Sequence, residues 1–403
     1  MGAPNTDMQE QSGEGTMTVE RKPQVEVVRV SDAHAEALAD FLRASWGDTS
    51  TPADVRAARA AAAAANPVEP GADVPTFIFL SDGKVLGHIG TIPVRFWNGT
   101  GEHAAHWFNG FMVLPEFRNG PIGYSVLKEA VRQLGIVAVL TVAAPSRRLF
   151  KAMGFVDYGA VPNHIAVLHP SRVLTALDVE ALGLGGLPPW APRLVRLAQR
   201  TGLAALGGAV AAGALGIWKL ARGAASGLDT SVGADAASVA ELDALWRAAR
   251  AGIAASPVRD GAYLKWRYGP AEQGDAYEMV AVRDGRELVG AAAVRRPRGE
   301  GDPRLRGIKV ATLSEIIFPP ARADAGLATL AAAERAARAL GADALLCTAS
   351  HPALAALLPR RGFVRLPGNA HFMVRDPKNA HALPPALDAW WITRGDASAD
   401  EVF

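Results

Sequence analysis

Two stretches of the chain combine apolar runs with the same sharp turn. In each, an Asp-Gly pair separates two strand-like runs, at Asp82-Gly83 and at Asp284-Gly285. The paired runs are 76–81 with 85–96 and 277–283 with 287–295. An Asp-Gly pair between two such runs is typical of a β-hairpin. The pattern therefore predicts one hairpin in each half of the chain.

The same series of elements follows each hairpin: a strand, a long helix, a strand, a short helix and a Gly-Phe-Val segment. In the first half the long helix, strand and short helix are predicted at 122–134, 137–142 and 146–153. In the second half the long helix and the strand are predicted at 327–340 and 344–348. The two Gly-Phe-Val segments begin at Gly154 and Gly362, about 200 residues apart. An ordered repeat of this kind predicts two related domains.

Helices that alternate with strands predict an α/β or α+β fold, in which helices pack on the faces of a sheet. We expect a first domain at 24–175 and a second at 230–376. The intervening 176–229 is predicted to be a basic, apolar, Ala/Gly-rich helical linker. Residues 1–23 form a predicted disordered tail, and 377–403 a C-terminal tail that Trp390-Trp391 would pin to a domain.

Composition narrows the functional classes. Of 403 residues, 49% are hydrophobic and 20% charged, which excludes a disordered chain, and the net charge of +2 gives no sign of a nucleic-acid partner. The single cysteine, Cys347, excludes an intrachain disulfide and a multi-cysteine cluster, and we predict no metal. Residues 1–22 lack the apolar core of a secretion signal, so we expect a cytoplasmic protein.

Residues 190–222 raise the question of a membrane. The stretch 202–218 carries no charge, cations flank it on both sides, and no Asp or Glu occurs between 181 and 228. Three structures fit this pattern: a helix buried against a domain, a helix lying on an anionic membrane face, and a membrane span. The Ala and Gly content disfavours the span, so we expect at most a peripheral membrane contact.

The segment 112–128 carries the most informative chemistry. A strand is predicted to end at Leu114, and the loop 118–123 opens a helix. Backbone N–H groups and the positive end of the helix would make an anion site there for a phosphate or pyrophosphate, with Arg118 adding a charged contact. The segment is neither a Walker A loop nor a G-x-G-x-x-G fingerprint. An ordinary strand-to-helix turn is the other interpretation of this loop.

The run Val113-Leu-Pro-Glu-Phe-Arg-Asn-Gly-Pro-Ile-Gly123 resembles the V-x-P-x-[FY]-R-x-x-G-x-[GA] motif of the GNAT acyltransferases. The resemblance covers about 24–165, and the second half matches in element order only, so the chain resembles a tandem GNAT protein. The resemblance implies an α/β (α+β) fold of two GNAT-like domains, each with a mixed, mostly antiparallel sheet and helices on both faces. It implies acetyl-CoA or another acyl-CoA as donor, with Arg118 beside the pyrophosphate and Ser146 near the acyl group. The implied pyrophosphate contacts are the amides of Asn119, Gly120, Ile122, Gly123 and Tyr124. The implied contacts of the pantetheine arm are Met112, Val113 and Leu114.

Two residues depart from the family pattern. Pro121 stands where the family has its first glycine, which removes one N–H donor. Phe150 stands where many members have a proton-donating tyrosine. Tyr124 is a candidate replacement acid. For the base that would accept a proton from an amine we predict His106, with Glu116 as a second candidate. In the second half, Asp324 in the corresponding loop would repel a phosphate, so we expect no coenzyme site there.

Two further features suggest an acceptor site. Glu315 would line a cleft between the domains, or be a charge at a strand edge. The run 263–268 would recognise a sugar, or pack its aromatic rings at the start of a strand. The resulting hypothesis is an N-acyltransferase, with acetyl transfer favoured, acting on an amine of a small-molecule or saccharide acceptor. The alternatives are a degenerate GNAT pair that binds acyl-CoA or acts as a scaffold, and a FemX-like aminoacyl transferase.

Overall fold

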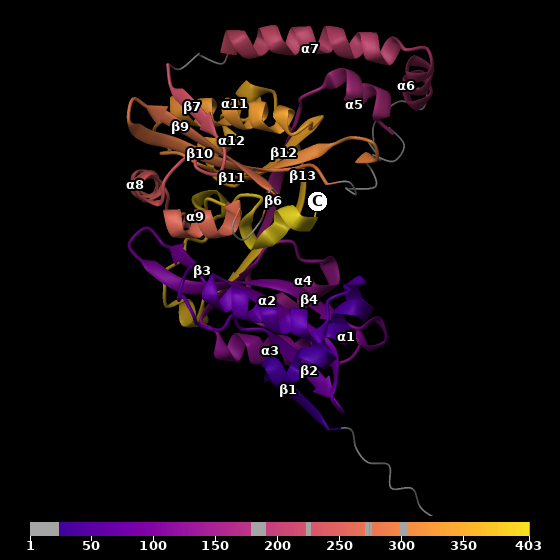
Figure 1. Ribbon diagram of the computed structural model, residues 1–403, viewed down its shortest axis with the longest axis vertical. Helices are drawn as coiled ribbons and strands as arrows, with labels where there is room; N and C mark the ends of the chain where they lie inside the picture. The colour runs from indigo at the N-terminus through magenta and orange to yellow at the C-terminus, as the bar shows by residue number, and fades with distance from the viewer. Residues whose placement is uncertain are drawn as a thin grey trace, which may run out of the picture.

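The computed structural model describes residues 24–178, 191–222, 227–270, 274, 276–298 and 305–402 (Figure 1). The strands are β1 (Val25–Arg29), β2 (Phe77–Ser81), β3 (Lys84–Trp97), β4 (Glu102–Val113), β5 (Ile136–Val139), β6 (Val156–Val167), β7 (Asp229–Val232), β8 (Ser256–Pro257), β9 (Tyr277–Asp284), β10 (Glu287–Arg295), β11 (Val310–Ile317), β12 (Ala344–Thr348) and β13 (Val364–Arg375). The helices are α1 (Ala35–Trp46), α2 (Pro52–Ala64), α3 (Ile122–Gln133), α4 (Ala144–Ala152), α5 (Pro170–Ala176), α6 (Ala191–Arg200), α7 (Leu203–Arg222), α8 (Val239–Arg250), α9 (Gly261–Tyr268), α11 (Ala323–Ala339) and α12 (Pro352–Ala355). The predicted tail 1–23 lies outside the described residues.

Both predicted hairpins form. In the first, β2 pairs with β3 across a turn in which Asp82 and Gly83 have φ angles of 47° and 77°. Positive φ at both central residues is the signature of the type I′ turn, whose twist matches that of the flanking strands. In the second, β9 pairs with β10, and Gly285 takes φ 59° at the turn.

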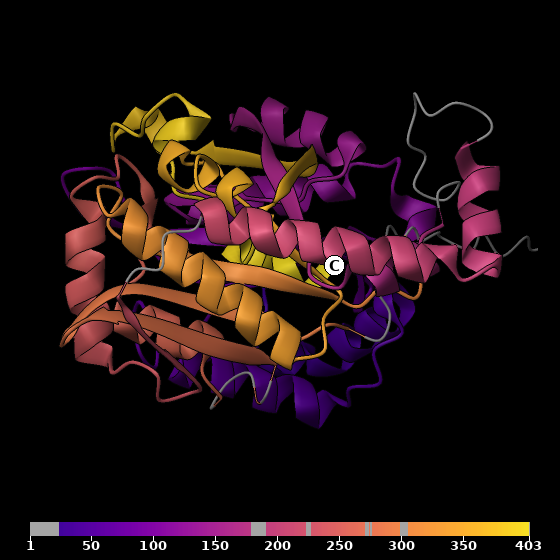
Figure 2. The ribbon, with the colours of Figure 1, turned by 90° about the horizontal axis from the view of Figure 1, so that it is seen from above.

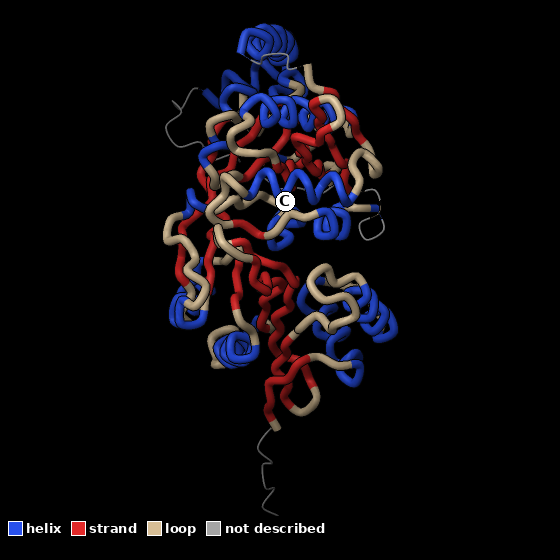
Figure 3. The backbone as a smooth tube through the Cα atoms, turned by 90° about the vertical axis from the view of Figure 1, so that its left-hand side faces the viewer, coloured by secondary structure: helices blue, strands red, loops and turns tan. Residues whose placement is uncertain are grey.

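The strands of both halves join in one sheet. Among the described residues, thirteen strands connect, twelve of them in the order β1-β2-β3-β4-β5-β13-β6-β12-β11-β10-β9-β7, with β8 beside β3. The last strand of each half therefore lies against the other half: β13 pairs with β5, and β6 pairs with β12. Figure 3 shows strands running continuously from one half to the other. We refer to this arrangement as the strand exchange.

Helices cover both faces of the sheet, as predicted for an α/β (α+β) fold. In the first half, α3 packs on one face of β2 and β3, and α1 with α2 lies on the other. In the second half, α11 covers β9 and β10 on one face, and α8 covers β10 and β11 on the other (Figure 1). Helices α6 and α7 form the predicted helical linker, and they pack on α5. Among the described residues, no helix combines the length and apolar character needed to span a bilayer.

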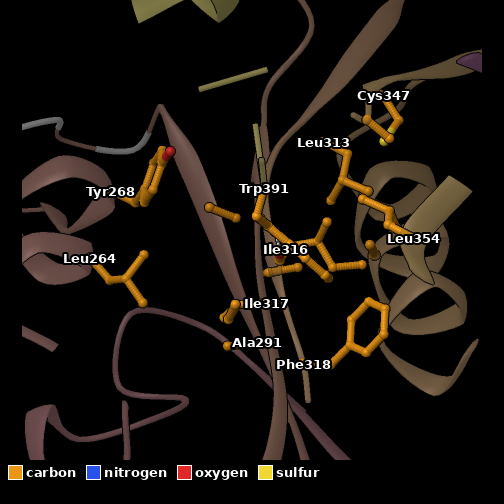
Figure 4. Close-up of a cluster of buried hydrophobic side chains, with 14 of the residues drawn as sticks. Leu264, Tyr268, Ala291, Leu313, Ile316, Ile317, Phe318, Cys347, Leu354 and Trp391 are labelled. Atoms are coloured by element: carbon orange, nitrogen blue, oxygen red, sulfur yellow. Dashed lines mark hydrogen bonds between the residues drawn. The ribbon is translucent and has the colours of Figure 1, made fainter. Parts of the chain in front are cut away.

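The C-terminal tail is built into the core. Trp390 and Trp391 are fully buried, and Figure 4 shows Trp391 beside Ile316 of β11 in the cluster of apolar side chains. The indole N–H of Trp391 donates to the Ile316 carbonyl at 3.0 Å, which satisfies the one polar atom that burial of this ring brings into the core. The tail therefore has a fixed position against the second half.

A buried arginine holds the tail in this position. The Arg259 guanidinium donates to Glu315 of β11 at 2.9 Å, to Asp396 of the tail at 2.8 Å and to Thr393 at 3.2 Å. Its remaining N–H group donates to the Ser256 hydroxyl and to the Pro257 carbonyl. All three charged groups are almost completely buried, and burial raises the pKa of both carboxyl groups while Arg259 opposes that rise. We call Arg259, Glu315 and Asp396 the Arg259 cluster.

We predict that Arg259→Ala lowers the free energy of unfolding by about 3–5 kcal/mol, because it leaves two carboxyl groups buried without a cation. The matched control is Arg322→Ala, since Arg322 pairs with Asp284 and Asp324 on the surface. Such an exposed pair contributes less than about 1 kcal/mol. Urea unfolding curves measure both variants, and equal losses would contradict a structural role for the cluster.

Candidate active site

Two parallel strands of the first half diverge and leave an opening in the sheet. The strands β4 and β5 pair only between 105–107 and 136–138. Beyond Trp107, β4 continues to Val113 with β3 as its partner, while β5 ends at Val139. The far edge of β4 therefore carries backbone groups that no strand pairs.

A cavity of about 920 Å³ lies at this divergence. Its walls come from the end of β4, from the segment after β5, from β3 and from the loop after α1. The tail supplies Ala397 and Ser398. The lining includes Trp46, Asp48, His88, Asn109, Phe111, Met112, Thr141, Ser146 and Phe150. Thr141 takes φ 50°, which is rare for a β-branched residue and marks a strained turn at the cavity wall.

The loop that was predicted to bind an anion lies next to this cavity. Helix α3 begins at Ile122 with Pro121 as its N-cap, and the first intrahelical bond runs from Ser125 N–H to the Pro121 carbonyl. The N–H groups of Ile122, Gly123 and Tyr124 therefore precede the hydrogen-bond pattern of the helix. Pro121 lacks an N–H, but its φ of −78° is helical, so the helix still starts here. Together these groups suit an anion.

Gly123 brings the start of α3 into contact with the end of β4. A Cβ at this position would lie 3.3 Å from Phe111 Cζ and 3.5 Å from Val113 Cγ2. The absence of a side chain lets α3 approach β4 closely. The backbone N–H groups at the start of α3 are therefore near the end of the unpaired strand edge.

The three residues predicted to pair with a pantetheine arm differ in orientation. The Leu114 N–H donates to the Leu86 carbonyl of β3 at 3.0 Å, so Leu114 is committed to that neighbour. Because polar groups alternate along an antiparallel strand, Val113 presents its groups to the opposite side, and those of Met112 face β3. Arg118 Nε donates to the Val113 carbonyl at 3.2 Å. The Val113 N–H is thus the group of this set that points away from β3.

The remaining predicted donor contacts lie around the cavity. Ser146, in the first turn of α4, lines it. Asn119 and Gly120 are exposed in the loop before α3, as is Arg118. Phe150 also lines the cavity, and its ring packs against Phe108, Phe111 and Phe155 with centroid distances of 4.9–6.3 Å. An apolar ring at this position provides contact area and no proton.

The three predicted catalytic residues do not converge on the cavity. His106 lies on β4 between β3 and β5, outside the cavity lining, and burial together with Arg29 lowers its pKa to about 4. Glu116 is exposed in the short helical turn before the loop. Tyr124 is 47% exposed on the surface of α3, beside Lys128. Their catalytic roles remain predictions that the geometry does not favour.

The cavity contains a histidine that sequence reasoning missed. His88 of β3 lines the cavity, and its Nδ1 lies 2.9 Å from the Gly110 carbonyl. A carbonyl accepts only, so Nδ1 carries the proton and Nε2 keeps its lone pair. Burial lowers the pKa of His88, which keeps the ring neutral near pH 7, although the bond to Gly110 acts in the other direction. The sequence signal for this position was the pair of glycines, Gly87 and Gly90, that flank His88 in β3. A glycine beside a histidine on a strand leaves space for the imidazole ring.

The second half has a similar divergence, but the tail fills it. Strands β11 and β12 pair between 310–313 and 344–347, and β11 continues beyond this point to Ile317. Gly395 N–H donates to the Ser314 carbonyl at 2.7 Å on this open edge, next to Trp391. The predicted repelling residue, Asp324, pairs with Arg322 at 2.8 Å. A segment of the chain itself thus occupies the place that is a cavity in the first half.

Both features that were predicted to bind an acceptor contribute to the protein core instead. Glu315 is 1% exposed and belongs to the Arg259 cluster, so it does not line a cleft. The run 263–268 was expected to recognise a sugar or to start a strand, and it forms helix α9 instead. Its Tyr263 and Tyr268 are buried, because the helix packs its aromatic face into the core. The described residues contain no group of three or more His, Cys, Asp or Glu side chains placed to hold a metal ion.

Comparisons with known proteins bear on the fold. No family model and no curated protein sequence matches the chain. A probable N-acyltransferase of unknown function from Enterococcus faecalis V583 superposes with a TM-score of 0.53 at 9% identity, over 89% of this chain and 74% of that chain. A GCN5-related N-acetyltransferase from Kribbella flavida gives 0.51 at 14% identity, over 90% and 74%.

A third match is Saccharomyces cerevisiae N-myristoyltransferase with bound myristoyl-CoA. It gives a TM-score of 0.53 at 11% identity, over 87% of this chain and 82% of that chain. At these identities the likeness establishes the fold alone. The predicted GNAT-like fold is therefore confirmed, in an arrangement of two such domains.

The low pKa of His106 leads to a prediction about acid stability. The folded pKa lies below the ordinary 6.5, so the unfolded chain binds a proton first, and stability falls as the pH drops below about 6.5. The free energy of unfolding of the wild type should fall between pH 7 and pH 4.5, and we expect the fall to be about 2–3 kcal/mol smaller in His106→Gln. Urea unfolding at both pH values measures this, and an unchanged acid loss would place His106 in a solvated site.

Proposed function

We propose that this protein is an acyl-CoA-dependent N-acyltransferase that transfers an acetyl group to an amine of a small-molecule or saccharide acceptor. The observation that supports the proposal is the cavity of about 920 Å³ between β4 and β5, with the unpaired edge of β4 and the start of α3 beside it. These features provide a cavity lined by both apolar and polar side chains, a strand edge and an anion site in one place. An acyl thioester joined to a pyrophosphate requires that combination.

The chain offers a complementary group for each part of the donor. The N–H groups of Ile122, Gly123 and Tyr124 would hold the pyrophosphate, with Arg118 nearby. The Val113 N–H would pair with the pantetheine arm along β4. Ser146 and the ring of Phe150 line the cavity where the acyl group would lie. The thioester carbonyl would thereby be held for attack from the side of β3.

His88 is the base that we propose in place of His106. Its Nδ1–H is fixed by Gly110, so Nε2 is left as an acceptor at the cavity wall. As the amine nitrogen bonds to the acyl carbon, the thioester C–S bond breaks, and His88 Nε2 takes the proton that the amine loses. Phe150 has no proton to give, so the sulfur would leave as a thiolate.

Titration calorimetry with acetyl-CoA tests the donor site. We expect micromolar affinity for the wild type and at least a hundredfold loss for Gly123→Glu, because a carboxylate would repel the pyrophosphate at the start of α3. Gly123→Ala is the matched control: it brings the same Cβ close to Phe111 without a charge, and should retain affinity within about tenfold.

Two results would contradict this placement. Equal binding by Gly123→Glu and Gly123→Ala would move the pyrophosphate site away from α3. If the wild type bound neither acetyl-CoA nor longer acyl-CoAs, the hypothesis of a scaffold protein would replace the hypothesis of an acyltransferase. Tight acetyl-CoA binding would argue against the aminoacyl-transferase alternative, whose donor is a charged tRNA.

The role of His88 is tested once a screen of primary amines has supplied an acceptor. We expect His88→Gln to lower kcat about 10²–10⁴-fold with little change in the KM for acetyl-CoA. The acidic limb of the wild-type pH–rate profile, which reports the base, should disappear. If His106→Gln lost this activity and His88→Gln kept it, the base would be His106.

A further inference from the structure

Helix α7 exposes a row of apolar side chains to solvent. Leu203, Leu206, Val210 and Ile217 are 59–74% exposed. At about 100° per residue their directions fall within an arc of roughly 60°. The preceding helix, α6, adds Leu194 and Leu197, which are 52% and 56% exposed. We call these six residues the apolar stripe.

The other side of α7 is used for packing within the protein. Gly208 lies so close to α5 that a Cβ would come within 2.3 Å of Ser171 Cα, and Ala204 is buried on the same side. Gln199 Nε2 of α6 donates to the carbonyls of Leu174 and Leu177 at 2.9 Å. The helices are therefore fixed to α5 by one face, and the stripe points away from the protein.

Positive charge accompanies the stripe. In the sequence, Arg193, Arg196 and Arg200 lie in α6, Lys219 and Arg222 follow the last residue of the stripe, and no Asp or Glu occurs between 181 and 228. Arg193, Arg196 and Arg200 are exposed on α6. These five cations exceed the chain's net charge of +2, so the rest of the chain is net negative.

We propose that α6 and α7 dock the protein onto an anionic lipid surface, with the apolar stripe in the boundary between headgroups and acyl chains. An apolar helix face bordered by cations is the pattern of a helix that lies in the plane of a membrane. Anionic headgroups attract basic side chains near the surface and supply the charge that this segment lacks.

A second copy of the chain fits this surface less well. Two copies that met through the stripe by twofold symmetry would bring the same patch together from both sides. The sequence carries cations at both ends of α6 and α7, so such an interface would bring cations of one copy near cations of the other. Like charges that meet at an interface oppose association. An acidic lipid surface meets no such repulsion.

Docking in this way leaves the proposed active site free. Figure 1 shows α7 along the top of the molecule, at the far end from α1, α2 and α3, and Figure 2 shows it lying across that surface. The cavity is lined by β3, β4 and the loop after α1. The membrane would hold the second half, while the first half faces the aqueous phase.

Sedimentation of the full chain with vesicles tests the proposal. We expect binding to vesicles of equal parts phosphatidylcholine and phosphatidylglycerol, little binding to phosphatidylcholine alone, and a loss of binding as salt is raised above about 0.1 M. Val210→Glu should weaken binding at least tenfold. The matched control is Val239→Glu, which alters a valine that is 45% exposed at the start of α8, and it should bind as the wild type does.

Charge is tested separately with Arg193→Gln and Arg200→Gln, each of which should weaken binding about fivefold. Equal binding to both vesicle types, or unchanged binding of Val210→Glu, would overturn the proposal. Sedimentation velocity without lipid provides a further check. A wild-type dimer that Val210→Glu dissociates would assign the stripe to a second copy of the chain.

Discussion

One buried guanidinium joins parts of the chain that are far apart in sequence. Arg259 donates hydrogen bonds to Glu315 of β11, to Asp396 of the tail and to the hydroxyl of Ser256. Burial of three charges is tolerated because each guanidinium N–H group has an acceptor. The tail leaves this cluster through Ala397 and Ser398, both at φ 55°, and these two residues form part of the cavity wall. The cavity therefore depends on an ion cluster in the other half of the molecule.

The two halves use the same geometry for opposite purposes. In each, a pair of parallel strands separates and exposes a strand edge. The first half keeps the space open as a cavity, and in the second half Trp391 and Gly395 bond to that edge at Ile316 and Ser314. A tail that satisfies the edge internally removes the need for a ligand. The repeated geometry thus supplies one cavity and one anchor for the wall of that cavity.

The sequence pattern predicted most local structure and little of what crosses between the halves. Period-2 and period-3.6 spacing, with turn residues such as Asp82-Gly83, depend on neighbours along the chain, so the hairpins and α3 could be anticipated. Apolar alternation in β13 says which face is buried but not which strand lies beside it, so the strand exchange was missed. His88 was missed because its role depends on the Gly110 carbonyl, a contact between residues on different strands. Glu315 was misplaced because its partner is distant in sequence.

The strand exchange also affects how the chain is made. Strand β5 ends at Val139, and its neighbour β13 begins at Val364, so more than 200 residues are translated between the two. At about 5–20 residues per second, a ribosome needs on the order of ten seconds or more to deliver that partner. During this time the nascent first half has an open strand edge that can pair wrongly with other chains. Completion of the first half is therefore delayed until the end of synthesis, when β13 pairs with both β5 and β6.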